Sequence, residues 1–144
     1  MRMRRFIIVA IALAILAVAA LVFGSSAAKR RAESISCGNY VVAIMCAARM
    51  WSNDHGERLP PDLLNMSNEL NSPKILHCPG DHVRERVRTF GEFTEAHSSY
   101  EVVAPGAPEW NTNTVFLRCR VHGHLGYVDG TVFDGKRRRR KTLW

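Results

Sequence analysis

The sequence predicts an α+β fold in which one long N-terminal helix is followed by a small antiparallel β-sheet. Residues 6–23 form an apolar run without charge, proline or glycine, and residues 27–52 continue with apolar side chains at helical spacings. The chain after residue 98 instead has short β-branched or alternating segments separated by turn residues. With 144 residues and no internal repeat, the chain is long enough for one modest core.

The apolar run, FIIVAIALAILAVAALVF from Phe6 to Phe23, predicts a membrane anchor. As a helix, its eighteen residues would reach ~27 Å, which is about the thickness of the hydrocarbon core of a bilayer. Arg2, Arg4 and Arg5 precede the run and favour a cytoplasmic N-terminus. We therefore expect a single-pass protein of the inner (cell) membrane, with its C-terminal domain on the periplasmic or extracytoplasmic side.

The same N-terminus allows a second interpretation. A basic start, an apolar run and the small residues Ser25–Ala27 are also typical of a secretory signal with its cleavage site. The run is longer than the apolar core of about 7 to 15 residues that is usual in a signal peptide, which favours an uncleaved anchor. Both interpretations place the body of the protein outside the cytoplasm, where disulfides persist.

The net charge of +7 comes from the two ends of the chain. Residues 24–135 hold eleven Lys and Arg residues against all thirteen Asp and Glu residues, a net charge of −2. The body is therefore near neutral, and the high pI does not indicate a nucleic-acid-binding domain. The sequence divides into a basic cytoplasmic N-terminus (1–5), a transmembrane helix (6–23), an α+β domain (24–135) and a basic C-terminal tail (136–144).

After the apolar run, an amphipathic continuation of the helix is expected to about Ser52. Gly56 and the two prolines that follow it predict its C-terminal end, because glycine favours the left-handed cap and proline cannot continue a helix. The predicted apolar stripe comprises Ala32, Ile35, Val42, Met45 and the stem of Arg49.

The rest of the body is expected to be built from short elements. Asp129-Gly130, between two β-branched segments, is a strong hairpin signal. Residues 81–97 are polar and predict no regular element, and the basic tail is expected to be disordered. The predicted elements are a short helix opening at residue 61 and strands at 74–78, 99–103, 114–121, 125–128 and 131–133.

A set of segments spread along the body carries a family resemblance. They are Cys37–Asn39, Ala47–Pro60, Leu76–Asp81, Ser99–Glu101, Arg118–His124 and Val128–Val132. In this order they resemble the type IV pilin-like proteins, and most closely the relatives of the major pseudopilin of type II secretion. The resemblance implies a pilin-like α+β fold in which the second half of the long helix packs on the antiparallel sheet.

The resemblance also implies a role. The chain is expected to be a membrane-anchored, pseudopilin-like structural component of a type II secretion or type IV pilus-like system. Its partners would be the membrane and other pilin-like subunits or secretion-system proteins, with no small-molecule substrate. The start departs from the family pattern, because Arg5 replaces the glycine before the cut site and Ala10 replaces the fifth-position glutamate. Processing by a prepilin peptidase and filament assembly therefore stay open.

Two cysteines and two histidines offer competing chemistries. Cys78 follows a predicted strand and Cys119 lies within one, so a Cys78–Cys119 disulfide is expected. It would close a loop of ~40 residues and stabilise the fold by roughly 3 to 4 kcal/mol. The same two thiols with His122 and His124 form a Cys-x2-His-x-His pattern that could bind zinc. A disulfide and zinc thiolates exclude each other, and both stay open.

The other two cysteines are nine residues apart on one helix and cannot bridge each other. Cys46, in the apolar context VAIMCAA, is expected to be a small buried residue. Cys37 either pairs elsewhere or stays free.

No cofactor is expected, and calcium and zinc are the alternatives. Major pseudopilins bind calcium through a C-terminal loop, and Asp129 and Asp134 lie in the corresponding part of this chain. The Asp129-Gly130 pair is better explained by turn chemistry, and two carboxylates are few for calcium.

The basic tail leads to an alternative function, a membrane-tethered binding module that does not assemble into a filament. Such a module would use a His/Cys metal site or an anionic surface. Nucleic acid is not an expected partner, because no aromatic residues are interleaved with the basic ones. An enzyme is not expected either, since no nucleophile elbow, phosphate loop or metalloprotease motif is present. The residues for anionic-surface binding are Lys136, Arg137, Arg138, Arg139, Arg140 and Lys141.

Overall fold

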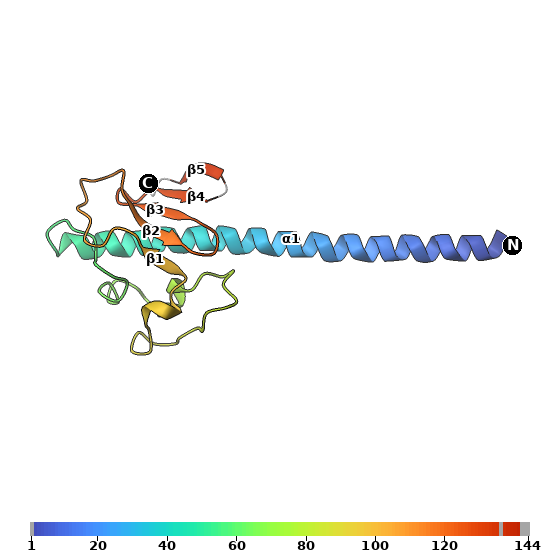
Figure 1. Cartoon of the computed structure of the whole chain (residues 1–144), viewed down its shortest axis with the longest axis horizontal. Coiled ribbons are helices and arrows are strands. Elements are labelled where there is room, and N and C mark those ends of the chain that lie inside the picture. Colours follow the sequence, from blue (N-terminus) through green and yellow to red (C-terminus); the bar gives the residue numbers. More distant parts are fainter. Residues whose placement is uncertain (1, 136, 142–144) are drawn as a thin grey trace. The chain divides into compact units, whose positions relative to one another are not determined.

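The computed structural model describes the backbone of residues 2–135 and 137–141. Side chains are described for residues 24–135 and for Ile11, Leu13, Ile15 and Leu16. The chain divides into two compact units, residues 1–32 and 33–144. The structure confirms an α+β fold, with one long helix and a small antiparallel sheet (Figure 1).

Helix α1 extends from Arg2 to Asn53. Within the part of the chain whose side chains are described, no helix is both long and apolar enough to cross a bilayer. The predicted anchor, Phe6 to Phe23, lies largely outside that part.

The C-terminal end of α1 confirms the sequence prediction. The chain leaves the helix through Gly56 and Glu57, whose φ angles of 69° and 57° place both in the left-handed region. The N–H groups of His55 and Glu57 both donate to the carbonyl of Ser52 at 3.0 Å, which satisfies an orphan acceptor of the last turn. His55 also stacks on Trp51, with ring centroids 3.6 Å apart.

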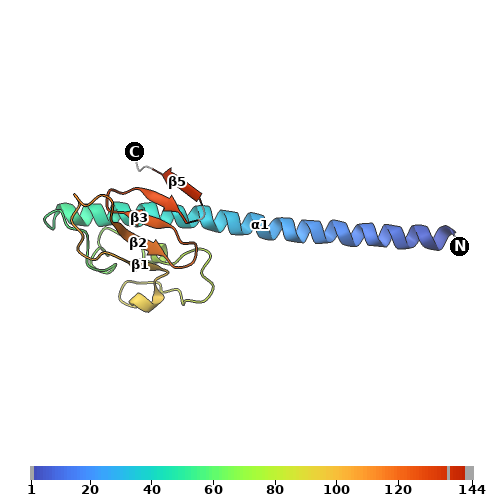
Figure 2. The same cartoon turned by 45° about the horizontal axis from the view of Figure 1, so that its top comes forward.

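The sheet is an antiparallel meander in the order β1-β2-β3-β4-β5. In Figures 1 and 2, β1, β2 and β3 lie side by side along the C-terminal part of α1. The strands are β1 (Tyr100–Val102), β2 (Val115–Cys119), β3 (Leu125–Tyr127), β4 (Val132–Asp134) and β5 (Arg137–Lys141). Two short 3-10 helices, η1 (Pro73–Leu76) and η2 (Glu95–His97), lie in the connection before β1.

The β3–β4 hairpin forms around Asp129-Gly130, as the sequence predicts. Leu125 pairs with Phe133. The Gly130 N–H donates to the Tyr127 carbonyl at 2.8 Å, and Gly130 has φ 82°, a conformation that glycine adopts without strain. The strands predicted at 99–103 and 114–121 are confirmed as β1 and β2.

Three element predictions were wrong, and two have visible local causes. Residues 61–72 form turns instead of a helix, because the Asp62 carboxylate accepts from the backbone N–H of Asn65 at 2.9 Å. The strand predicted at 74–78 is η1, which Ser72 caps by accepting from the Lys74 N–H. The tail predicted to be disordered has the backbone of Arg137–Lys141 in β5, paired with β4.

The buried face of α1 also differs from the predicted stripe. Ile35, predicted to be in the core, is 61% exposed, whereas Cys46, predicted to be buried, is exposed. The helix approaches β3 closely at Gly126, which has no side chain. A Cβ at this position would lie only 2.7 Å from the Met45 sulfur. The buried face comprises Cys37, Val41, Ile44, Met45, Ala48 and Ser52, all fully buried.

Candidate metal centre

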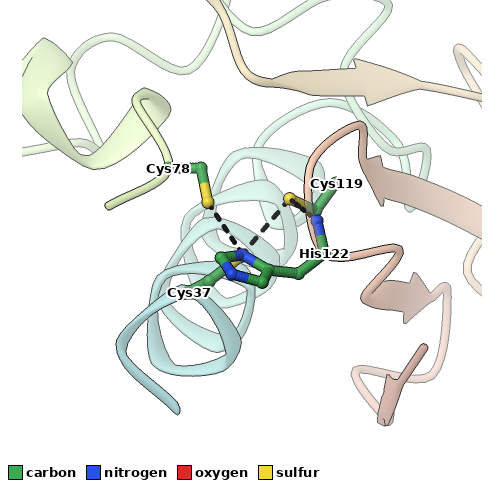
Figure 3. A group of neighbouring side chains, drawn as sticks. All are labelled: Cys37, Cys78, Cys119 and His122. Carbon is green, nitrogen blue, oxygen red and sulfur yellow. Dashed lines mark hydrogen bonds between the residues drawn. The ribbon is translucent and has the colours of Figure 1, made fainter. Parts of the chain in front are cut away.

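Three cysteines and one histidine converge between the helix and the sheet. The three thiol sulfurs and one ring nitrogen of His122 all lie within 4.8 Å of one another. Figure 3 shows Cys37 coming from α1, Cys78 from the loop after η1, and Cys119 from the end of β2. The three cysteines are 0 to 1% exposed, and His122 is half-buried. We call Cys37, Cys78, Cys119 and His122 the Cys3His cluster.

Two close approaches define its geometry. The sulfurs of Cys37 and Cys119 are 3.4 Å apart. The Cys78 sulfur lies 3.1 Å from Nδ1 of His122. All four atoms therefore lie near one point, at separations that one small cation could bridge.

The end of β2 forms a tight turn around the Cys119 sulfur. The backbone N–H groups of Val121 and His122 each donate to this sulfur at 3.4 Å. The turn closes through Gly123, which has φ 71° and donates its N–H to the Cys119 carbonyl at 3.0 Å. The local geometry thus surrounds one sulfur with donors and directs the imidazole three residues later toward the same point.

The loop that carries Cys78 is organised by a buried carboxylate. The Cys78 N–H donates to the Ser99 hydroxyl at 2.9 Å, and that hydroxyl donates to Asp81 at 2.6 Å. Asp81 also accepts from the Arg84 guanidinium at 2.6 Å and is only 3% exposed. Gly80, two residues after Cys78, packs against the His122 ring. A Cβ at Gly80 would lie 2.6 Å from Cε1 of that ring. These contacts fix the sulfur of Cys78 and the orientation of the imidazole together.

On the helix side, Cys37 has a second polar neighbour. Its sulfur lies 3.6 Å from the hydroxyl of Tyr100, the first residue of β1. Tyr100 has no exposed surface, and this burial raises the pKa of its phenol. The phenol therefore stays neutral and can donate a hydrogen bond to a thiolate at position 37.

The contacts among the three thiols shift their pKa values in different directions. The hydrogen bond from Cys37 lowers the pKa of Cys119 well below its ordinary value, and the N–H groups of Val121 and His122 act in the same direction. The same contact raises the pKa of Cys37, and hydrogen bonding to Cys119 raises the pKa of Cys78 to about 11. These contacts favour the thiolate form at Cys119, and a thiolate is the form that binds metals.

The structure changes the predicted ligand set. Cys78, Cys119 and His122 come together, as the zinc alternative predicts, and the fourth member is Cys37. The ring of His124 lies beside that of His122, with centroids 5.8 Å apart, but its nitrogens face other groups. Nε2 of His124 lies 3.0 Å from the carbonyl of Ser34, and its Nδ1 lies 3.6 Å from an Asp134 oxygen. Gly123, between the two histidines, has φ 71°, so the chain turns there and the two rings do not follow the regular alternation of a strand.

The predicted disulfide is not formed in the structure, where all four cysteines of the described chain are free thiols. Cys78 and Cys119 do lie in the same cluster, but Cys37 approaches Cys119 to 3.4 Å and competes for the same sulfur. The disulfide stays a prediction about the oxidised protein. Cys37 was not predicted as a member, because the predicted stripe of the helix began with Ala32 and Ile35, although its member Met45 is buried.

The two aspartates considered for calcium have other roles. One Asp129 oxygen accepts from the N–H of Thr131 at 2.8 Å and from its hydroxyl at 2.6 Å. This is the turn chemistry expected of an Asp-Gly hairpin. An oxygen of Asp134 lies 3.6 Å from Nδ1 of His124.

The side chains proposed for anionic-surface binding lie outside the described residues, although the backbone of Arg137–Lys141 forms β5. A separate concavity of about 560 Å³ shares no residue with the Cys3His cluster. Its lining is mixed, with basic, aromatic and apolar side chains that include Tyr40, Lys74, Arg86, Arg88, Phe93 and His97.

Comparison of the chain with protein-family models, with curated proteins and with solved structures gives no match.

Proposed function

We propose that the chain is a membrane-anchored, pseudopilin-like structural component of a type II secretion or type IV pilus-like system. The observation that carries this proposal is the architecture around α1. One continuous helix, Arg2 to Asn53, begins in an apolar run, and its C-terminal part packs on an antiparallel meander. This is the arrangement that the resemblance to pilin-like proteins implies.

Exposed apolar side chains support the membrane anchor. In residues 1–32, a unit taken by itself, four large apolar side chains of the run are between 55% and 65% exposed. Exposed apolar residues gathered in this way on one helix indicate contact with lipid or with another apolar surface. They are Ile11, Leu13, Ile15 and Leu16.

The proposed mechanism is structural. The apolar run is buried in the membrane or in the core of a filament, and the α+β body is presented to neighbouring subunits or secretion-system proteins. Arg5 and Ala10 at the start of the run leave two versions of this role open. The chain either assembles with other pilin-like subunits or acts as an anchored relative that does not assemble.

The anchor is tested by membrane fractionation of the full chain in a host cell. We expect the chain to remain in the membrane pellet after alkaline carbonate extraction. The double variant Ala14→Arg/Ala17→Arg should move it to the soluble fraction, because each arginine at the centre of a span costs about 2.5 to 3.5 kcal/mol. Asn113→Arg, at an exposed position in the loop before β2, is the matched control. A wild-type chain released by carbonate would contradict the proposal.

The two versions are separated by intact mass and by crosslinking in membranes. A chain that begins at Phe6 and carries an added methyl group would show that a prepilin peptidase accepts this junction and would favour assembly. A chain that keeps Met1 or Arg2, without crosslinks to pilin-like subunits, would favour the anchored relative. Cleavage near Ala27 would leave no tether and would overturn the membrane-anchored role.

A second candidate function is a membrane-tethered binding module, and the Cys3His cluster is the observation that favours it. Such a module would bind a metal ion without contacts between subunits. Crosslinks between neighbouring bodies would favour the pseudopilin-like role, whereas metal binding without such crosslinks would favour the binding module. The anionic-surface version predicts binding to anionic vesicles that weakens with salt and is lost on deletion of 136–141.

A further inference from the structure

We propose that Cys37, Cys78, Cys119 and His122 bind one Zn²⁺ ion in a closed, tetrahedral, structural site. The site lies wholly within residues 33–144 and is argued from their geometry. It does not depend on the pseudopilin-like role, because an anchored or an assembled chain would contain the same cluster.

The separations within the cluster fit tetrahedral zinc. Zinc binds thiolate sulfur at about 2.3 Å and imidazole nitrogen at about 2.0 to 2.1 Å, so tetrahedral ligand atoms lie roughly 3.5 to 3.8 Å apart. The Cys37 and Cys119 sulfurs are 3.4 Å apart, and the longest separation among the four ligand atoms is within 4.8 Å. Side-chain adjustments of less than about an ångström would therefore complete the coordination.

The donor set selects the class of metal. Three thiols and one imidazole are soft or intermediate ligands, which suit zinc and disfavour calcium and magnesium, ions that require several oxygens. The nearby Asp81 carboxylate is already held by Ser99 and Arg84. Four protein ligands leave no open position for water, which is the pattern of a structural and not a catalytic zinc site.

The groups around the cluster would stabilise the negative charge of such a site. Three thiolates, one neutral imidazole and Zn²⁺ carry a net charge of −1. The backbone N–H groups of Val121 and His122 donate to the Cys119 sulfur, and the Tyr100 hydroxyl lies beside the Cys37 sulfur. Hydrogen bonds of this kind to ligand sulfurs orient the ligands and stabilise the charge. On binding, Zn²⁺ forms three Zn–S bonds and one Zn–N bond, and the thiol protons pass to solvent.

A disulfide within the cluster is the competing chemistry, but it engages only two of the four groups. Joining Cys37 and Cys119 would shorten their separation from 3.4 Å to about 2.05 Å and would remove two electrons to an external oxidant. Cys78 and His122 would then keep only their mutual contact, in which Sγ and Nδ1 are 3.1 Å apart. One zinc ion engages all four groups at once, and it ties α1, the η1 loop and β2 together.

The first experiment measures metal and thiols on the full chain, purified in detergent from cells supplied with zinc. We expect one zinc per chain by elemental analysis. Native alkylation should modify one thiol, the exposed Cys46, and all four after chelation under denaturing conditions without reductant. A chain without zinc, with another metal in its place, or with thiols that react only after reduction would overturn the proposal.

Cobalt replacement tests the geometry on the wild-type chain, so it does not depend on a variant that folds. We expect Co²⁺ to give the intense visible bands of a tetrahedral ion with sulfur-to-metal charge transfer, and zinc to displace it at one equivalent. The weak spectrum of an octahedral ion without sulfur ligands would overturn the proposal.

Matched variants then identify the ligands. Cys119→Ser should lose the bound zinc, whereas Cys46→Ser, on the exposed face of α1, should keep it. Gly80→Ala should weaken zinc binding by about 10- to 100-fold, because the added Cβ would displace the His122 ring that it meets at 2.6 Å. Gly91→Ala is the control, since the nearest atom to its Cβ is 3.9 Å away. Equal zinc affinity in the two glycine variants would contradict the assignment of His122.

Discussion

The interface between helix α1 and the sheet is held in two different ways. In the Cys3His cluster, polar groups from three segments meet at one point. A short distance along the helix, the apolar side chains of Val41 and Met45 pack over Gly126 of β3. We call Val41, Met45 and Gly126 the apolar seam. Packing in the seam depends only on shape and volume, whereas the contribution of the cluster depends on what the sulfurs bind.

This difference predicts two separable contributions to stability. Zinc that binds only the folded state stabilises it by mass action, so the contribution of the cluster should rise with free zinc and vanish on chelation. The contribution of the seam and the core beside it should be the same in both conditions. Substitutions in each region can therefore be compared with zinc present and with zinc removed.

The largest effect is expected at Phe116, a fully buried residue of β2. Phe116→Ala should lower the free energy of unfolding by about 3 to 5 kcal/mol, because it removes a buried ring and leaves a cavity. Urea unfolding of the full chain in detergent, with and without a chelator, measures this loss. The loss should be the same in both conditions. A loss that disappears on chelation would show that the two regions act as one unit.

Asp81→Asn should have the next largest effect, because it weakens the loop that holds Cys78. Burial raises the pKa of Asp81, but hydrogen bonds from Ser99 and Arg84 outweigh it, so the pKa of this carboxyl lies well below its ordinary value. At neutral pH we expect a loss of about 2 kcal/mol, since hydrogen bonds to a charged acceptor are removed.

The sign of the pH dependence follows from the lowered pKa. The carboxylate stabilises the folded state fully above the ordinary value of about 4, and this stabilisation is lost as the pH falls below it. Between pH 7 and pH 3, the unfolding free energy of the wild type should therefore fall more steeply than that of Asp81→Asn. Asp54→Asn, at an exposed carboxylate, is the control and should keep the wild-type slope.

Gly126→Ala should destabilise the apolar seam by about 1 to 2 kcal/mol through overpacking. The added Cβ would lie 2.7 Å from the Met45 sulfur, so the methionine must shift. In a double-mutant cycle, Met45→Ala should make room for the new methyl group, and the combined loss should be smaller than the sum of the single losses. Additive losses would mean that helix and strand do not meet at this point.

The smallest effect is expected at Trp110, which is 66% exposed. Trp110→Ala should change the free energy of unfolding by less than about 0.5 kcal/mol, as is usual for an exposed residue away from packed groups. Trp51→Ala is the informative comparison, because Trp51 is half-buried and stacks on His55. Thermal unfolding should show a clearly larger loss for Trp51→Ala, and equal losses would contradict this assignment.

The parts of the fold that could be predicted from sequence are those with strong local signals. Gly56 and the following prolines marked the end of α1, and Asp129-Gly130 marked the β3–β4 hairpin. The segment between the helix and β1 could not be predicted, because side-chain hydrogen bonds such as the one from the Asn65 N–H to Asp62 override weak propensities there.

The cluster could be predicted only in part, since its fourth member depends on the rotation of the helix. The apolar pattern of α1 is rich in alanine, so it fits more than one face of the helix. Ile35 was assigned to the core, yet the buried face begins at Cys37 and passes through Val41 and Met45. A stripe drawn from Cys37 would have placed this thiol toward the sheet and Cys46 toward solvent. The Cys-x2-His pattern at 119–122 was the one part of the cluster visible within a single segment.

The spacing of the cluster residues along the chain has a consequence for how the protein folds. Cys37 and Cys119 are separated by 82 positions, and Cys78 and His122 by 44. Loops of this length close slowly and at an entropic cost, so the four groups cannot meet until α1 and the sheet have already docked. Only Cys119 and His122 are near neighbours in the unfolded chain. An ion captured early would therefore be held by this pair alone, and refolding should slow when excess zinc is present before the helix has reached the sheet.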